Sequence, residues 1–434
     1  MAKKSKVEKP RREVTKRQLS RWQKQKKRQR IIFGLAILVV VAVLSVIGVG
    51  VYKGWYVPEY KPLHETVIEV NGTEFDMEYY ITMFEYYYYA YYYEEGWPAE
   101  YMVYIADDIV EIIEQNELVR QKAMELGVTV SDEELYEALE IEGYDPQIIE
   151  KYRDVFRAQM LLERMSDEYF EQQVPQSAEQ RHLMAIFLES ESQANEVRAR
   201  LEEGEAFSEL AAELSLDETC KEKEGDLGWR PEGVLPFLVE SSVLEENAFS
   251  CEVGVLSEPI YEEAKTKMVG YWLIEVTERD EETEQAKAKV MLLGSEQEAN
   301  EVRDRLEEGE DFGELAAEFS QHAASSQNGG EFEVTAKGQV STVFDGFVFD
   351  PELELGSLSQ PIRDDEVSTT GGCWLIEVTE ADDNRQLDEE NRYVLKTDAL
   401  NQWVEGLMDD PDNNIVSYLD DEKKQWAVSY ITGG

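Results

Sequence analysis

The sequence predicts an α+β protein with a single transmembrane helix, a helical domain, two tandem small α+β domains and a C-terminal helix. Three observations predict this fold class: an uncharged apolar run near the N-terminus, helical periodicity over residues 57–177, and a stretch of sequence that is written twice. The chain has 434 residues, 42% of them hydrophobic, which is enough for several separate cores.

A basic arm and an apolar run open the chain. Residues 1–30 carry fourteen Lys and Arg against two acids, a net charge of 14 − 2 = +12. No charged residue occurs in 31–52, and at 1.5 Å per residue the twenty-one residues Ile31–Val51 cross a hydrocarbon core of about 30 Å. The alternative, a cleaved signal peptide, has an apolar part of only about 7–15 residues. We expect an uncleaved anchor, with the basic arm in the cytoplasm against anionic lipid and the bulk of the chain outside.

The charge of the outer part excludes nucleic acid as a partner. The whole chain carries −51, so the residues after the basic arm carry −51 − 12 = −63. Such a surface repels phosphate, and solubility is the ordinary reason for this charge. The histidines (His64, His182, His322) and the three cysteines show no metal-ligand spacing, so we expect no metal and no cofactor. A bond between Cys220 and Cys251 stays open beside buried free thiols.

The helical domain is expected over 57–177. A short strand reaches a turn at Asn71-Gly72, a helix follows, and Ser131 with Glu134 forms a capping box before another helix. The first helix contains the tyrosine-rich stretch 86–93, whose side chains point all round the axis. Either this helix is wedged between others or its tyrosines form a binding surface. A last helix and a tail are expected over 387–434.

A repeat of roughly 100 residues lies between these helical segments. Residues 195–215 recur almost unchanged as 300–320, and the seven letters of 272–278 recur as 374–380. Within each copy the pattern is strand, long helix, short helix, glycine-rich loop, helix and two strands. We therefore expect two domains, 179–280 and 286–382, each with helices packed on a small antiparallel sheet.

The first copy resembles the parvulin (PpiC-type) peptidyl-prolyl cis-trans isomerases. The resemblance rests on ANEVRARLEEGEAFSELAAELSLDETCKEKEGDLGW, then GVLSEPI and GYWLIEV, and covers about 179–280. The second copy matches through ANEVRDRLEEGEDFGELAAEFS, GSLSQPI and GCWLIEV, but its glycine loop is altered. The resemblance implies an FKBP-like α+β fold and catalysed rotation about X-Pro bonds, whose barrier is about 18–20 kcal/mol.

With its anchor and helices, the chain resembles the membrane-anchored SurA, PrsA and PpiD group of extracytoplasmic bacterial foldases. That resemblance implies that the helices of 57–177 and the segment 387–434 form one SurA-N-like chaperone domain. It also implies unfolded or proline-containing secreted polypeptides as partners and the bacterial cell membrane as the location.

Position by position, the resemblance assigns candidate site residues. In the first domain Asp217 stands at the family's Asp/Cys position, and Trp272 stands where the family has its second His. The family's first His falls on Ala185, so His182 lies three residues early, on the opposite face of the strand unless a bulge shifts it. The pocket for the proline ring would be lined by Leu227, Val234, Leu235, Phe237 and Trp272, with the indole of Trp272 next to Asp217.

In the second domain His322 replaces the acid. We expect weak isomerase activity confined to the first domain, around Asp217, and peptide binding alone in the second. The alternatives are a holdase chaperone whose two parvulin domains only bind peptide, and a surface scaffold that associates through its tyrosine-rich helix. The groove of the second domain would be lined by His322, Phe332, Val340, Phe344 and Trp374.

Overall fold

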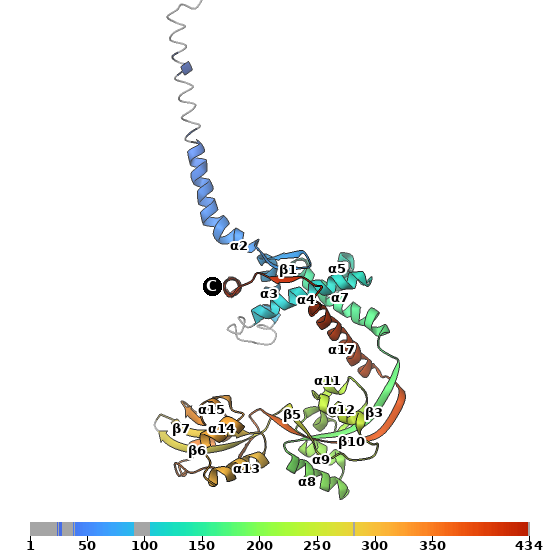
Figure 1. The fold of residues 1–434 in the computed structure, drawn as a ribbon. Helices are drawn as coiled ribbons and strands as arrows, with labels where there is room; N and C mark the ends of the chain where they lie inside the picture. The colour runs from blue at the N-terminus through green and yellow to red at the C-terminus, as the bar shows by residue number, and fades with distance from the viewer. Residues whose placement is uncertain are drawn as a thin grey trace, which may run out of the picture. The chain divides into compact units, whose positions relative to one another are not determined.

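A computed structural model describes residues 24, 26–27, 38, 40–90, 105–280 and 283–432 of the chain (Figure 1). The chain divides into two compact units. One consists of Met1–Met165 with Trp403–Gly434, and the other of Ser166–Gln402. We call the first the helical unit and the second the double-lobe unit, and we describe each by itself.

The helical unit begins with an exposed apolar helix. Residues 40–51 are α-helical and continue into η1 (Tyr52–Tyr60), a π-helix, and α2 (Lys61–Leu63). Within the described residues, Val40–Val57 is long and apolar enough to cross a membrane, and none of it is buried. The basic arm and the beginning of the predicted apolar run lie largely outside the described residues.

A three-stranded sheet joins the two ends of the helical unit. β1 (Thr66–Val70) and β2 (Thr73–Asp76) form a hairpin whose turn residues Asn71 and Gly72 have φ of 49° and 84°, as a two-residue hairpin turn requires. β11 (Ile415–Ser417) pairs with the other edge of β1, so the sheet order is β11-β1-β2 (Figure 1). The C-terminal segment thus packs against residues near the N-terminal helix.

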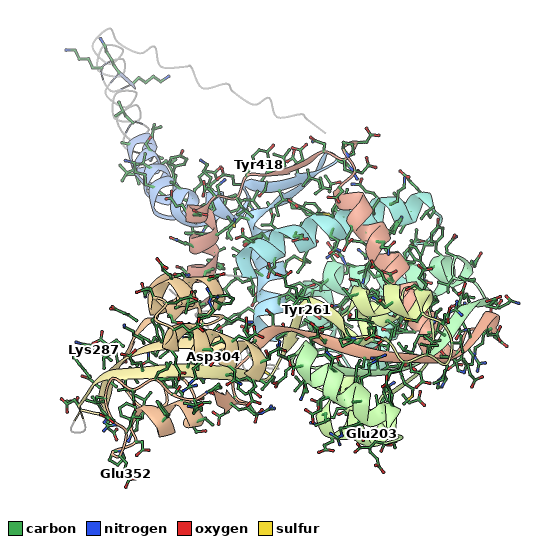
Figure 2. All side chains as sticks on the ribbon, turned by 60° about the horizontal axis from the view of Figure 1, so that its bottom comes forward. Glu203, Tyr261, Lys287, Asp304, Glu352 and Tyr418 are labelled. Atoms are coloured by element: carbon green, nitrogen blue, oxygen red, sulfur yellow. The ribbon has the colours of Figure 1, made fainter. Side chains whose placement is uncertain are left out.

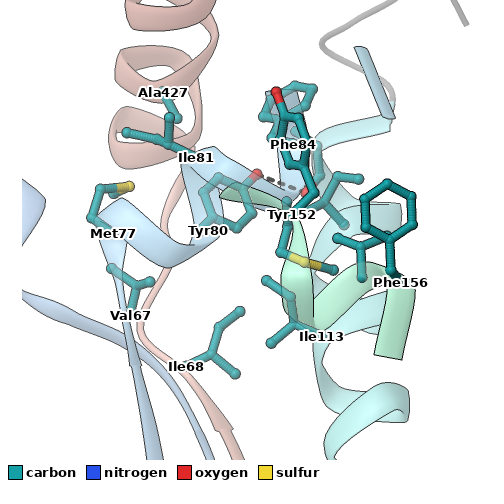
Figure 3. Packing of buried hydrophobic residues seen from close by; sticks show 14 of the residues in the cluster. Val67, Ile68, Met77, Tyr80, Ile81, Phe84, Ile113, Tyr152, Phe156 and Ala427 are labelled. Atoms are coloured by element: carbon teal, nitrogen blue, oxygen red, sulfur yellow. Dashed lines mark hydrogen bonds between the residues drawn. The ribbon is translucent and has the colours of Figure 1, made fainter. Parts of the chain in front are cut away.

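Five helices and the C-terminal helix enclose the core of this unit. Figure 3 shows Tyr80 surrounded by aliphatic and aromatic side chains from the sheet and the helices; Tyr80 is fully buried, and its hydroxyl donates to the carbonyl of Ala106 at 2.9 Å. The predicted capping box at Ser131 and Glu134 is confirmed. The helices are α3 (Met77–Tyr89), α4 (Ile105–Glu125), α5 (Asp132–Glu142), α6 (Pro146–Lys151), α7 (Arg153–Arg164) and α18 (Asp421–Thr432).

The tyrosines of α3 are mostly packed. Tyr86, Tyr87 and Tyr88 are half-buried against the core of the helical unit, and only Tyr89 is as much as 43% exposed. This agrees with a helix wedged between its neighbours. The remaining tyrosines of the stretch, 91–93, lie outside the described residues.

The double-lobe unit begins with η4 (Met165–Tyr169) and η5 (Phe170–Gln172), and α17 (Glu389–Met408) closes it and runs into the helical unit. Its first lobe is a four-stranded sheet of order β4-β3-β10-β5 with helices on both faces. The lobe comprises β3 (Ser177–Leu188), α8 (Glu191–Glu202), α9 (Phe207–Leu214), α10 (Glu218–Glu222), β4 (Asp226–Pro231), α11 (Leu235–Val239), α12 (Ser242–Ser250), β5 (Ile260–Lys267) and β10 (Thr369–Gln386).

The second lobe repeats this architecture with the sheet order β8-β7-β6-β9. Two apolar clusters, one on each face of the sheet, form its core. The lobe comprises β6 (Gly270–Asp280), β7 (Gln285–Leu293), α13 (Glu296–Glu307), α14 (Phe312–Phe319), α15 (Ala323–Gln327), β8 (Glu331–Val334), α16 (Thr342–Val348) and β9 (Ile362–Asp364).

The two lobes exchange their closing strands. β6, which ends the first repeat, pairs with β7 and β9 of the second lobe, whereas β10, which ends the second repeat, pairs with β3 and β5 of the first (Figure 1). The expectation that 179–280 and 286–382 each fold from their own contiguous residues is therefore corrected. The second lobe, 270–364, is inserted between the third and fourth strands of the first.

Candidate functional site

Asp217 is held in a buried ion pair in the first lobe. It precedes α10 and caps it, since its Oδ1 accepts the backbone N–H of Cys220 at 2.8 Å. Its other oxygen lies 2.9 Å from Nζ of Lys265 on β5, and the two residues are 7% and 8% exposed. The ammonium of Lys265 also donates to the carbonyl of Val239 at 2.7 Å. The carboxylate that the family resemblance marked as catalytic thus faces a lysine and not a groove.

Trp374 is the indole beside this ion pair. Nζ of Lys265 lies 5.4 Å from the centroid of the Trp374 ring and at the same distance from Phe187. The expectation that Trp272 would lie next to Asp217 is wrong, because Trp272 is on β6 and β6 belongs to the second lobe. For the same reason Trp374 does not line the groove of the second lobe, where the sequence had placed it.

Each indole is anchored by the same arrangement of buried polar groups. In the first lobe, Nε1 of Trp374 and Oγ of Ser241 both donate to the carboxylate of Glu262. In the second lobe, Nε1 of Trp272 donates to Asp364 at 2.9 Å, and Oγ of Ser341 donates to the same oxygen. A buried indole N–H needs an acceptor, and an acid on the neighbouring strand, β5 or β9, supplies it. Both indoles are therefore fixed parts of the cores.

The predicted proline pocket of the first lobe is filled. Leu227, Val234 and Leu235 are each at most 1% exposed, and Leu227 and Leu235 share one apolar cluster with Trp374. Phe237 alone stands out, 50% exposed. The side chains that would accept a proline ring are thus packed against each other in this conformation.

His182 lies on the far face of the β3 strand. Its Nδ1 is 2.8 Å from Oγ1 of Thr379, and its Nε2 is 3.4 Å from Asp226. Ala185 instead shares the apolar cluster of Trp374, as the counted register predicted for the first-His position. The pairing of β3 is irregular beside His182, but the extra residues, Thr379 and Leu227, belong to the neighbouring strands β10 and β4. His182 therefore stays on its own face of β3, where its partners do not include Asp217.

In the second lobe the candidate residues lie next to each other, and some of their side chains are partly exposed. The ring of His322 lies edge-on to Trp272 at 5.4 Å and to Phe332 at 4.9 Å, and Trp272 also packs on Phe344 at 5.0 Å. Phe332 and Val340 are only partly buried. Nδ1 of His322 is buried and makes no hydrogen bond within the described part of the chain. Burial also lowers the pKa of His322, so the ring is neutral at neutral pH.

The residue facing the Asp217 position differs between the lobes. Lys265 has its counterpart in Val367, which packs into the apolar cluster of Trp272. The first lobe therefore closes its site with a charge pair, and the second leaves an aromatic surface with an unpaired imidazole nitrogen. The cysteines are free, and burial raises the pKa of the Cys220 thiol well above its usual value.

Comparison with known proteins defines the class. Two models described as the PPIC-type PPIase domain match residues 182–278 and 262–382. The chain therefore carries two parvulin-type peptidyl-prolyl isomerase domains. The two matches overlap over 262–278, which contains most of β6, the strand that ends the first repeat but belongs to the second lobe.

The relatives are foldases and chaperones. The Chaperone SurA of Hahella chejuensis is 25% identical over 349 residues, which are 68% of this chain and 74% of that protein. The Foldase protein PrsA of Oceanobacillus iheyensis is 33% identical over 113 residues, 25% of this chain and 36% of that protein. A crystal structure of the peptidylprolyl isomerase PrsA from Bacillus cereus covers 86% of this chain and 92% of its own, with 13% identity and a TM-score of 0.26. By sequence, the chain is thus similar to a chaperone and to a foldase.

Proposed function

We propose that this chain is a membrane-anchored foldase of a bacterial extracytoplasmic space, which binds unfolded secreted polypeptides and catalyses X-Pro isomerisation slowly. The observation that carries the proposal is the pair of PPIC-type domains behind a helix apolar enough to span a membrane. The relatives named as a chaperone and as a foldase support it. Contact of the helix and the basic arm with lipid belongs to the same proposal.

Slow catalysis in the first lobe follows from the surroundings of Asp217. Rotation about an X-Pro bond needs an apolar seat for the ring and a carbonyl withdrawn from water. A proline segment that reaches Asp217 must first separate it from Lys265, and breaking a buried ion pair costs about 3–5 kcal/mol. Trp374, in place of Trp272, would then form the wall beside the substrate.

The second lobe is proposed to bind proline segments without catalysis. The neutral imidazole of His322 would offer its Nδ1 to a peptide once the side chains that bury this atom move aside, and Phe332 and Val340 offer apolar surface for the ring. No acid stands at the position of Asp217 there, because His322 occupies it. The lobe has a seat for proline but lacks the carboxylate of the family's site.

The alternative is a holdase in which neither lobe catalyses. It is favoured by the burial of Leu227, Val234 and Leu235, which leaves no seat for a proline ring in the first lobe. Both functions predict client binding, so only an isomerisation assay separates them.

A protease-coupled assay on a proline peptide, run with the full chain in detergent, tests the proposal. We expect a small acceleration over the thermal rate that Asp217→Asn abolishes and that Asp304→Asn, on the exposed face of α13, leaves unchanged. Suppressed aggregation of an unfolded client without any acceleration would make the protein a holdase. If neither effect is seen, the surface scaffold is the remaining function.

A further inference from the structure

A cavity of about 370 Å³ lies in the helical unit between β2, α3, α4 and α7. Phe75, Ile113 and Leu161 give it apolar walls, and Arg120, Arg153 and Arg157 stand around it. It is large enough for an extended peptide's side chains, since ligand pockets typically measure about 300–1,000 Å³. No residue of the two parvulin lobes takes part in it.

Glu117, the buried acid of the cavity, is fully used within the fold. Arg120 donates two hydrogen bonds of 2.7 Å to its carboxylate, and Gln121 and Thr73 donate to it at 2.6 and 2.7 Å. Although burial works to raise its pKa, these hydrogen bonds hold the pKa of Glu117 below its usual range. Glu117 is therefore an ionised and satisfied anchor for Arg120, and it does not compete for a ligand.

Arg153 has an unused hydrogen-bond donor. Its Nε is buried and makes no hydrogen bond within the described residues, and the nearest carboxylate oxygens, of Glu150 and Asp154, lie 3.6 Å from its guanidinium nitrogens. That distance is too long for a hydrogen bond. By contrast, Arg157 is engaged by Asp154 at 3.0 Å and by Asp132.

Helix α7 begins at the cavity. Arg153 is the first residue of the helix, and its N-cap Tyr152 makes no side-chain capping bond. The helix dipole favours an anion at such an end, and Asp154 in the first turn already supplies one. The charged groups that line the cavity sum to 3 − 2 = +1, and Asp132 and Glu150, which contact Arg157 and Arg153 from outside it, bring the local sum to 3 − 4 = −1. Attraction of a carboxylate here therefore depends on the unused hydrogen-bond donor of Arg153 and not on a net positive charge.

We propose that this cavity binds an unfolded client segment in which an apolar side chain stands next to an Asp or Glu side chain. The apolar side chain would lie on Phe75, Ile113 and Leu161, and the carboxylate would accept hydrogen bonds from the guanidinium of Arg153. The inference rests on the proposed function, because it names a class of client for the chaperone. It adds a sequence preference that is independent of proline.

Fluorescence anisotropy of short labelled peptides with blocked ends, titrated with the full chain in detergent, tests it. We expect a peptide with phenylalanine beside glutamate to bind on the order of tenfold more tightly than the same peptide with glutamine, the loss of one charge-assisted hydrogen bond. Arg153→Gln should remove that difference and leave the glutamine peptide unaffected. Arg200→Gln, on the exposed surface of α8, changes the net charge equally and should leave it intact.

Other outcomes separate this inference from the proposed function. If the chain prevents aggregation of an unfolded client but Arg153→Gln binds both peptides as the unchanged chain does, the cavity assignment falls and the chaperone stands. If no unfolded client is bound at all, both fall. A further peptide lacks glutamate and is tested with its C-terminus amidated and with it free. If the free C-terminus raises the affinity as much as glutamate does, and Arg153→Gln removes the gain, then the cavity binds a terminal carboxylate and the proposed preference for an Asp or Glu side chain is wrong.

Discussion

At the scale of single residues, the buried pair of Asp217 and Lys265 decides what the first lobe can do. Both charged groups are removed from water, and each depends on the other for compensation. Removal of one partner leaves an uncompensated buried charge, whereas removal of both leaves a neutral site. The pair thus stabilises the lobe, and Lys265 also blocks access to Asp217, its candidate catalytic acid.

Lys265→Met should therefore destabilise the first lobe by about 3–5 kcal/mol, and addition of Asp217→Asn should recover part of that loss. The reason is that methionine fills the volume of lysine but cannot neutralise the carboxylate. Hydrogen exchange of the β3 amides measures the stability of this lobe separately from the rest of the chain.

The exposed pair of Arg200 and Glu205 provides the matched control. These residues pair at 2.7 Å on the surface, so Arg200→Gln should leave β3 exchange unchanged. Equal exchange in Lys265→Met and in its double variant with Asp217→Asn would show that the two groups are not coupled.

The sequence predicted the position of Asp217 but not its neighbours. The spacing of the repeat located the acid, and the alternation of the strand placed His182 on the opposite face, where the structure has it. Lys265 and Glu262 could not be recognised, because 261–267 reads as a polar, exposed strand. Burial of these charges depends on the partners that the fold brings to them, and no local pattern carries that information.

At the scale of elements, the exchange of β6 and β10 is the main feature that the sequence could not reveal. The two strands are identical over seven residues, so either one presents the same side chains to either lobe. An exchanged and an unexchanged arrangement differ instead in the connections between the lobes. Val269 and Thr369 are buried where the chain crosses between the lobes, and Nζ of Lys267 donates to the carbonyl of Thr370 at 3.0 Å. A Cβ on Gly270 would lie 2.6 Å from Leu292, which shows how closely the crossing is packed.

Engineered cysteines test the exchange. Met184 on β3 lies opposite Glu377 on β10, and Glu275 is the equivalent of Glu377 on β6. Neighbouring residues on paired antiparallel strands fall within the distance that a disulfide spans. In a Cys251→Ser background we expect Met184→Cys with Glu377→Cys to form an internal disulfide, seen as faster migration without reductant.

Met184→Cys with Glu275→Cys is the control and should stay reduced under the same oxidation. Bridging of this second pair, with the first pair reduced, would mean that each repeat closes its own lobe. The measurement thus decides between two folds that have the same local sequence and nearly the same local contacts.

At the scale of the whole molecule, charge and hydropathy divide the chain more clearly than any motif does. Acidic side chains such as Glu203, Asp304 and Glu352 are exposed on the double-lobe unit (Figure 2). Exposed charges of one sign keep such a unit soluble. The division into basic arm, apolar run and acidic remainder was visible in the sequence because composition alone determines it.

Membrane anchorage is the last prediction. The apolar run 31–51 has the length of a hydrocarbon core, and the described part of its helix carries no buried residue that would need a protein partner. We expect the full chain to stay in the membrane fraction after alkaline carbonate washing, with peptides of 31–51 detectable by mass spectrometry. Deletion of 1–56 should release it in soluble form with client binding retained, whereas deletion of 1–20 should leave it in the membrane. Recovery of a soluble chain that lacks 31–51, without any deletion, would instead identify the run as a cleaved signal, because only a short apolar segment followed by cleavage leaves no anchor.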